Sequence, residues 1–195
     1  MTPRQIESVK SKIANIRAKL AAERKMFGGY MDSSGLRYRP LKYYIQIADY
    51  KGGLTYTRWF GKNFPEDMGF PDFLFEWTVI LFMNGKLREA EKKAFKTFCG
   101  NTYLFDKFFG REIVPIEKWE GSNLATPEFT EYFTYAEGDP GLEEFSDWLE
   151  ALTQSEKFTA AAEKFIEIKK KLKTELDHSK RSQLGRQSRE LLDNF

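Results

Sequence analysis

Histidine and cysteine, two residue types that often carry metal and nucleophilic chemistry, occur once each in this 195-residue sequence. The chain has a single histidine, His178, which follows Glu175 in a Glu-x-x-His spacing. On a helix this spacing puts two metal ligands on one face, but dinuclear sites of this kind need a second such motif. Because there is no second histidine, we expect no metal site. We interpret His178 as a surface residue near a helix C-terminus, where the helix dipole favours a cation.

The one cysteine, Cys99, has no second thiol with which to form a disulfide or a zinc site. Its neighbours Phe95 and Phe98 indicate an apolar setting, in which a thiol is inert. A chain without disulfides is typical of a reducing compartment. We therefore predict an unreactive core cysteine in a cytoplasmic protein.

Glycine-rich signatures of nucleotide or nucleophile sites are missing. The sequence contains no GxGxxG, GxxxxGK[ST] or GxSxG pattern. Gly85-Lys86 is followed by leucine and Gly61-Lys62 by asparagine, so neither pair has the hydroxyl that a phosphate-binding loop supplies. We expect no bound cofactor.

Glu76 is the acidic residue of most interest, because it lies inside the apolar run 73–83. Burial raises the pKa of a carboxyl group unless the group is paired. One interpretation is a general acid, since a glycosidase needs only two carboxylates. The other is a structural ion pair, with Arg58 or Arg88 as candidate partners, or an exposed edge position. We favour the structural interpretation and expect no enzyme activity.

The near-neutral total of 31 basic and 29 acidic residues hides a division along the chain. Residues 1–63 carry 13 basic against four acidic residues, whereas residues 112–163 carry two basic against 13 acidic ones. Such asymmetry bears on partners and not on fold. Aromatic residues make up 16% of the chain, which excludes intrinsic disorder and predicts a substantial core.

The basic first third raises nucleic-acid binding as an alternative function. Basic and aromatic residues alternate there, as a single-strand binding surface requires: Lys51, Arg58 and Lys62 lie among Tyr50, Tyr56, Trp59 and Phe60. The same aromatic residues fall where a helix pair needs a core. The acidic segment would also repel phosphate, so we keep this function as the alternative.

The first segment, residues 1–27, predicts an amphipathic basic helix. Thr2, Pro3 and Gln5 form a helix start with a capping box. The apolar side chains then follow a narrow seam at spacings of three and four: Ile6, Val9, Ile13, Ile16 and Leu20. Such a seam either docks on its own domain or pairs with a second copy in a homo-oligomer. The basic faces of the helix would also suit an arm that binds nucleic acid.

The rest of the chain reads as helices with no period-two strand, so the predicted class is all-α. We expect helices near 40–47, 51–63, 71–83, 86–99, 103–109, 127–136, 140–152 and 155–176. Glycine and serine in 28–37 mark a boundary, which divides the chain into 1–27, a helical domain 38–176, and a charged tail or short helix 177–195. No secretory leader is visible, and the longest apolar run is too short to span a bilayer, so we expect no membrane segment.

Three stretches share a helix–turn–helix pattern with a small residue at a fixed offset after the turn. The turns lie at Ala48, Gly85 and Glu156, and the small residues are Gly53, Ala90 and Ala161. This pattern resembles tetratricopeptide repeats in degenerate form. The small residues are 37 and then 71 residues apart, against about 34 in a regular array. We expect antiparallel helix pairs in a right-handed array or in an irregular bundle.

The resemblance implies a concave surface, lined by the first helix of each pair, that binds a peptide or helix of another protein. The groove residues that it implies are Lys42, Gln46, Asp72, Phe75, Val79, Met83, Glu143, Ser146 and Glu150. The expected function is therefore protein–protein interaction, as an adaptor, regulator or inhibitor of another protein.

Overall fold

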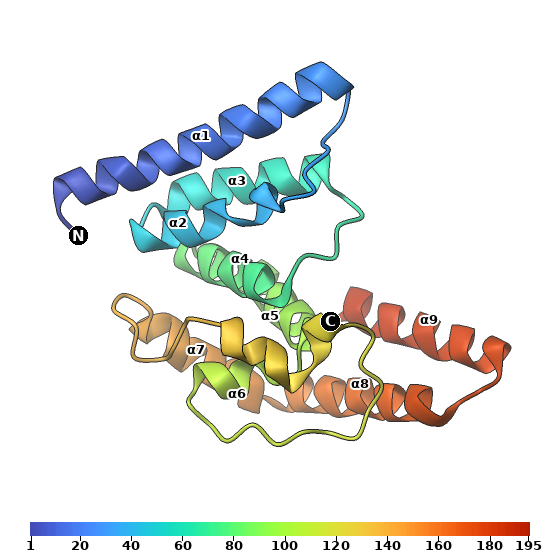
Figure 1. Ribbon diagram of the computed structural model, residues 1–195. Helices are drawn as coiled ribbons and strands as arrows, with labels where there is room; N and C mark the ends of the chain where they lie inside the picture. Colours follow the sequence, from blue (N-terminus) through green and yellow to red (C-terminus); the bar gives the residue numbers. More distant parts are fainter. The chain divides into compact units, whose positions relative to one another are not determined.

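The computed structural model describes residues 1–195 and is helical without strands, which confirms the all-α prediction. The chain forms two compact units, Met1–Leu87 (unit 1) and Arg88–Phe195 (unit 2). This division differs from the three segments expected, because the first helix and residues 38–87 share one unit. Figure 1 shows the helices of both units in sequence colours.

Unit 1 begins with a helix whose ends are specified locally. The Thr2 hydroxyl accepts from the Gln5 amide, and the Gln5 side chain accepts from the Thr2 amide, so the expected capping box is confirmed. Gly28 ends the helix in the left-handed conformation, with φ 72°. The elements of unit 1 are α1 (Pro3–Phe27), η1 (Leu36–Tyr38), α2 (Pro40–Gln46), α3 (Tyr50–Asn63) and α4 (Pro71–Met83).

The apolar seam of α1 packs against its own unit. Val9 and Ile13 are buried in a core cluster that also contains Leu41 and Tyr44 of α2. The seam is therefore docked on its own unit, as one of the expected roles requires. The buried seam side chains are not free to pair with a second copy of the chain.

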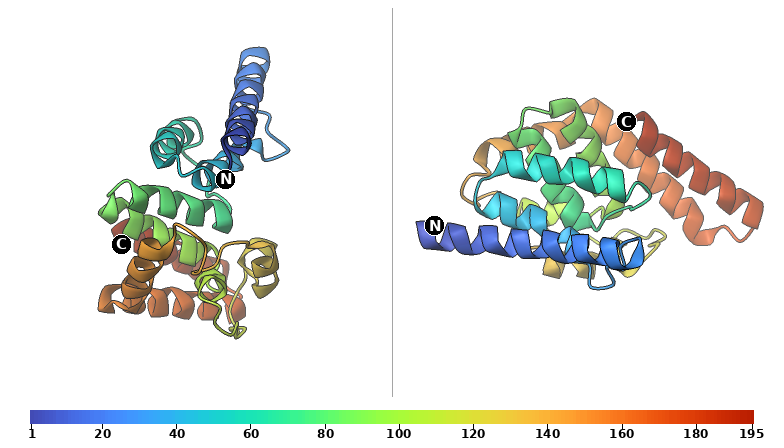
Figure 2. Two further views of the ribbon diagram at one scale, coloured as in Figure 1. Left: turned by 90° about the vertical axis from the view of Figure 1, so that its left-hand side faces the viewer. Right: turned by 90° about the horizontal axis from the view of Figure 1, so that it is seen from above.

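Helices α2, α3 and α4 pack against one another, with α2 and α3 side by side as an antiparallel pair (Figure 2). The turns at Ala48 and Gly85 share a left-handed backbone, with φ 53° and 68°. Two of the three aligned turn positions therefore share one backbone conformation. The third does not, because Glu156 is the first residue of a helix capped by Ser155, whose backbone is extended.

Gly53, the small residue of the first helix pair, faces the helix that follows that pair. A Cβ atom at this position would lie 2.4 Å from Cδ1 of Ile80. Ile80 belongs to α4, so the glycine allows α3 to approach the following helix. Close packing between α3 and α4 therefore depends on the missing side chain.

Unit 2 contains the remaining helices and the longest loop. Its elements are α5 (Leu87–Gly100), which begins at the last residue of unit 1, α6 (Leu104–Phe108), η2 (Asn123–Ala125), η3 (Pro127–Tyr132), α7 (Glu143–Gln154), α8 (Glu156–Thr174) and α9 (His178–Asn194). The helix expected from Pro140 begins only at Glu143, because Gly141 has a left-handed backbone with φ 85°. Asp139 belongs to the turn before it, where its carboxylate accepts a hydrogen bond from the Ala136 amide. The helix expected at 127–136 is a 3-10 helix.

The helix predicted over 155–176 ends at Thr174, and Asp177 starts α9 by accepting from the Lys180 amide. Residues 177–195 are thus mostly a 17-residue helix, which runs back antiparallel to α8 (Figure 1). Phe195 stacks on Phe95 at 4.3 Å between ring centroids and anchors the end of this helix in the unit 2 core.

Candidate functional site

The candidate site is a cavity of about 460 Å³ in unit 1, between α2 and α4. Its lining residues are Ser34, Gly35, Tyr38, Arg39, Lys42, Tyr43, Phe70, Asp72 and Glu76. Two of the expected groove residues, Lys42 and Asp72, lie in this lining. We call it the α2–α4 cavity.

The α2–α4 cavity carries charges of both signs. Arg39 and Lys42 come from the start of α2, whereas Asp72 and Glu76 are four residues apart on α4 and so share one face of that helix. Glu76 is only 4% exposed. Tyr38, Tyr43 and Phe70 add aromatic surface, so the cavity combines ionic and apolar lining.

Asp72 is the least satisfied polar group of this cavity. Burial raises the pKa of its carboxyl group, although backbone N–H groups and Lys42 act in the opposite direction. Its Oδ1 atom is buried and has no hydrogen-bond partner. An unsatisfied buried acceptor costs about 1–3 kcal/mol, and this cost falls on a side chain in the wall of the cavity.

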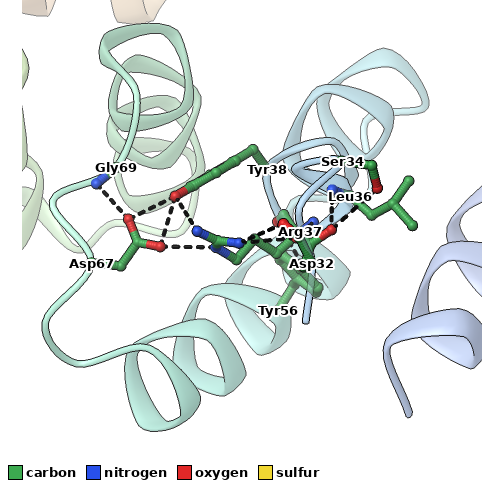
Figure 3. Close-up of polar contacts among 8 residues, drawn as sticks. All are labelled: Asp32, Ser34, Leu36, Arg37, Tyr38, Tyr56, Asp67 and Gly69. Atoms are coloured by element: carbon green, nitrogen blue, oxygen red, sulfur yellow. Dashed lines mark hydrogen bonds and ion pairs between the residues drawn. The ribbon is translucent and has the colours of Figure 1, made fainter. Parts of the chain in front are cut away.

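A polar network fixes Tyr38 at the edge of the cavity (Figure 3). The Tyr38 hydroxyl donates to the Asp67 carboxylate at 2.7 Å and accepts from Arg37 Nη2 at 2.8 Å. Arg37 Nε also donates to Asp67 at 2.8 Å, and the Tyr56 hydroxyl donates to the Arg37 carbonyl at 2.7 Å. Residues from η1, α3 and the loop before α4 thereby hold one aromatic wall of the cavity in place.

Asp32 shapes the loop that closes the cavity at Ser34 and Gly35. It is 7% exposed and accepts from the amides of Leu36 and Arg37 at 2.7 and 2.8 Å. An aspartate that accepts from downstream amides is the usual way of building such a turn. The loop is therefore set by hydrogen bonds from backbone amides to the Asp32 carboxylate.

The network changes the titration of two of its members. Burial, together with the neighbouring Asp67, raises the pKa of Tyr38 to about 12. Burial would also raise the pKa of Asp67, but hydrogen bonds from Tyr38, the Gly69 amide and Arg37 outweigh it and leave that pKa lowered. Both shifts favour the ionised aspartate and the neutral tyrosine.

The other expected groove residues do not join this cavity. Phe75 and Val79 are fully buried, which corrects their assignment to an open surface. Gln46 is exposed and Met83 half-buried, and neither lines the cavity.

The three expected groove residues on α7 belong to unit 2. Glu143 is exposed, and Glu150 pairs with Arg111 at 2.7 Å. Ser146 is buried and donates to the Leu142 carbonyl, so it cannot line a groove. The expected groove therefore reduces to the part formed by α2 and α4.

A second cavity of about 570 Å³ lies between α1 and α3. Its lining residues are Arg17, Ala18, Ala21, Arg24, Lys25, Tyr30 and Trp59. Of the basic–aromatic set noted over 50–62, only Trp59 takes part. Tyr56 and Phe60 are buried in the core, and Lys51, Arg58 and Lys62 do not line this cavity.

Cys99 lies on α5 and His178 at the start of α9. Burial raises the pKa of the half-buried Cys99 thiol, which fits the expected inert cysteine. Glu175 lies between α8 and α9, so it does not share a helix with His178. His178 is at the N-terminus of α9, which corrects its expected place near a C-terminus. No cluster of three or more potential metal-ligating side chains is present.

Sequence reasoning missed the network residues Arg37, Tyr38 and Asp67 and the lining residue Tyr30. The Asp32-Ser-Ser-Gly35 segment indicated a turn, but nothing in it pointed to Asp67, which lies 30 residues after Arg37. Only packing brings η1 and the loop that contains Asp67 together.

The chain was also compared with known proteins. No protein-family model, no curated protein and no solved structure matches it. None of its helices combines the length and the apolar character that crossing a membrane would need.

Proposed function

We propose that unit 1 binds a peptide segment of another protein in the α2–α4 cavity, so that the chain acts as an adaptor, regulator or inhibitor. The observation that carries this proposal is that α2 and α4 line one cavity with Lys42 and Asp72 among its walls. In the resemblance to tetratricopeptide repeats, these helices are the first members of consecutive pairs. The matching turns at Ala48 and Gly85 support the same pairing.

The lining indicates the chemistry of the peptide. A volume of about 460 Å³ is within the usual range for a ligand pocket. The rings of Tyr38, Tyr43 and Phe70 would take an apolar side chain. Lys42 would attract a carboxylate, and Asp72 would accept a hydrogen bond from a basic group or an amide. We therefore expect an apolar residue flanked by charges of both signs.

A displayed peptide library, selected against the whole protein, tests this proposal and needs no identified partner. An enriched peptide is then titrated by calorimetry against the wild type and against Lys42→Glu. We expect at least a tenfold loss of affinity for this variant, which corresponds to about 1.4 kcal/mol. Lys51→Glu is the matched control, because Lys51 is also exposed but lies on α3 outside the cavity.

Asp72→Asn provides a second variant at the same site. It keeps the size of the side chain and removes the charge, so a peptide that presents a basic group to Asp72 loses affinity. If no peptide is enriched, or if the enriched peptide binds all these variants equally, the α2–α4 cavity is not the binding site.

A further inference from the structure

The second cavity of unit 1 has a lining of a different kind, and we call it the α1–α3 groove. It contains three basic side chains and two aromatic rings but no carboxylate. We propose that the α1–α3 groove binds single-stranded nucleic acid. This function is separate from peptide binding, because the two cavities share no lining residue.

The positive charge of the groove is available to a ligand. Arg17, Arg24 and Lys25 are exposed, and none of them forms an ion pair. Arg24 donates to Asn63 at 2.9 Å, a neutral partner that leaves its charge uncompensated. Arg17 and Arg24 are seven residues apart on α1, which separates them by about 10 Å along the axis. The groove therefore presents charge along a line, as a phosphate backbone requires.

The floor and walls of the groove suit a flexible strand. Ala18 and Ala21 are exposed and small, so they leave room between the basic residues. Tyr30 and Trp59 pack edge to face, with 5.7 Å between ring centroids, and both are half-buried. Aromatic rings beside cations bind single strands by stacking on bases, and each stacked base contributes about 1–3 kcal/mol.

Further apolar surface lies where α1 ends. Phe27 is 59% exposed, and it follows Arg24 by three residues, which places the two on neighbouring parts of the helix surface. Met26 and Met31 are 74% and 65% exposed. No core role accounts for these side chains, and Phe27 supplies a ring on which an unpaired base can stack.

Charge along the chain also favours phosphate at this unit. Unit 1 carries 14 basic against eight acidic residues, and the acidic segment 112–163 belongs to unit 2. An acidic peptide would satisfy the basic side chains, so it is tested below as the competing ligand. A membrane surface would use the exposed methionines but would not enter the groove. Nucleic acid uses both the charges and the rings.

Fluorescence anisotropy with a labelled oligothymidylate of about 12 nucleotides tests the proposal across a salt series. We expect binding by the wild type at low salt and a linear fall of log K with log salt. The double variant Arg17→Gln/Arg24→Gln should lower the affinity at least tenfold and reduce the slope by about 1.4, or about 0.7 for each lost contact.

Arg4→Gln/Lys19→Gln is the matched control, because it removes the same number of charges from exposed positions of α1 outside the groove. Circular dichroism establishes that both double variants stay folded. If the two double variants lose equal affinity, binding follows net charge alone and the groove is not the site.

Phe27→Ala separates stacking from charge, since it should weaken binding while the salt slope stays unchanged. Polyglutamate and vesicles of phosphatidylcholine with phosphatidylserine are titrated in parallel. Failure to bind the oligonucleotide at low salt overturns the proposal, and so does preferential binding to polyglutamate or to the vesicles. Loss of peptide binding in Lys42→Glu is read out separately, so the two proposals can fail independently.

Discussion

Asp67 is the acceptor on which the network around Tyr38 depends. Its carboxylate receives the Tyr38 hydroxyl, the Arg37 guanidinium and the Gly69 amide, and only 13% of its side chain is exposed. Hydrogen bonds to a charged group contribute more than bonds between neutral groups. The position of one wall of the α2–α4 cavity therefore rests on the charge of a single residue.

We expect Asp67→Asn to lower the free energy of unfolding by about 1–2 kcal/mol at neutral pH. Because the pKa of Asp67 is lowered in the folded state, its contribution is present above the unfolded value of 3.8. The contribution is lost as the pH falls through the lower folded value. Urea unfolding at several pH values should therefore show that the difference in unfolding free energy between wild type and variant shrinks below about pH 4. A difference that does not change with pH would contradict this assignment.

The turns at Ala48 and Gly85 allow a paired test of backbone strain. Ala48 has φ 53°, a conformation that costs a residue with a Cβ atom roughly 1 kcal/mol. Ala48→Gly should raise the unfolding free energy by about 0.5 kcal/mol, since the more flexible unfolded chain offsets part of the relief. Gly85→Ala should lower it by about 1 kcal/mol, because a Cβ atom there meets no neighbour and only the backbone resists. Thermal unfolding should therefore show a higher melting temperature for Ala48→Gly and a lower one for Gly85→Ala.

At the scale of helices, unit 1 is held by the close approach of α3 to α4. Gly53 lies against Ile80, which is fully buried, and the core continues through Phe60 and Phe73. These two rings are 4.7 Å apart between centroids. The position of α4, and with it that of Asp72, therefore depends on a contact that tolerates no added atom.

Gly53→Ala should lower the unfolding free energy by about 1–2 kcal/mol, although alanine is the better helix former. Its Cβ atom would lie 2.4 Å from Ile80 Cδ1, the atom that Ile80→Val removes. The double variant should therefore be more stable than the sum of the two single changes predicts, by at least about 0.5 kcal/mol. Simple additivity would show that this contact does not limit the packing of α3.

At the scale of the whole molecule, each unit has a core of its own. The core cluster of unit 1 draws only on residues between Val9 and Ile80, including two from α1. In unit 2, Phe95, Phe158 and Phe195 pack on one another and join α5, α8 and the end of α9. Stability is therefore expected to be local to each unit.

We expect Ile13→Ala to destabilise unit 1 by about 2–4 kcal/mol and Phe195→Ala to destabilise unit 2 by about 3 kcal/mol. Both side chains are at most 8% exposed. Hydrogen exchange measured by mass spectrometry shows which segments of the chain each substitution destabilises. Faster exchange should be confined to residues 1–87 in the first variant and to residues 88–195 in the second. Equal acceleration along the whole chain would mean that the two units unfold together.

The sequence alone determined the helical class and most helix positions, because these follow from local rules. The capping residues Thr2 and Gln5, the break at Gly28 and the apolar spacing along α1 act within a few residues of chain. Lys42 and Asp72, two groove residues implied by the resemblance to tetratricopeptide repeats, line one cavity. The same resemblance was wrong about the exposure of Phe75 and Val79, since an almost uniformly apolar helix has no periodic signal for the face that remains exposed.

Tertiary packing alone decided which side chains meet. The Arg37–Asp67 pair and the approach of Tyr30 to Trp59 join residues far apart in the sequence, with no spacing rule to connect them. The position of Gly53 against α4 was equally hidden, because a small residue shows that something approaches but not which helix it is. Helix formation depends on near neighbours in the chain, whereas cavities form where distant segments come together, so the sequence predicted the helices and the structure was needed to find the two cavities.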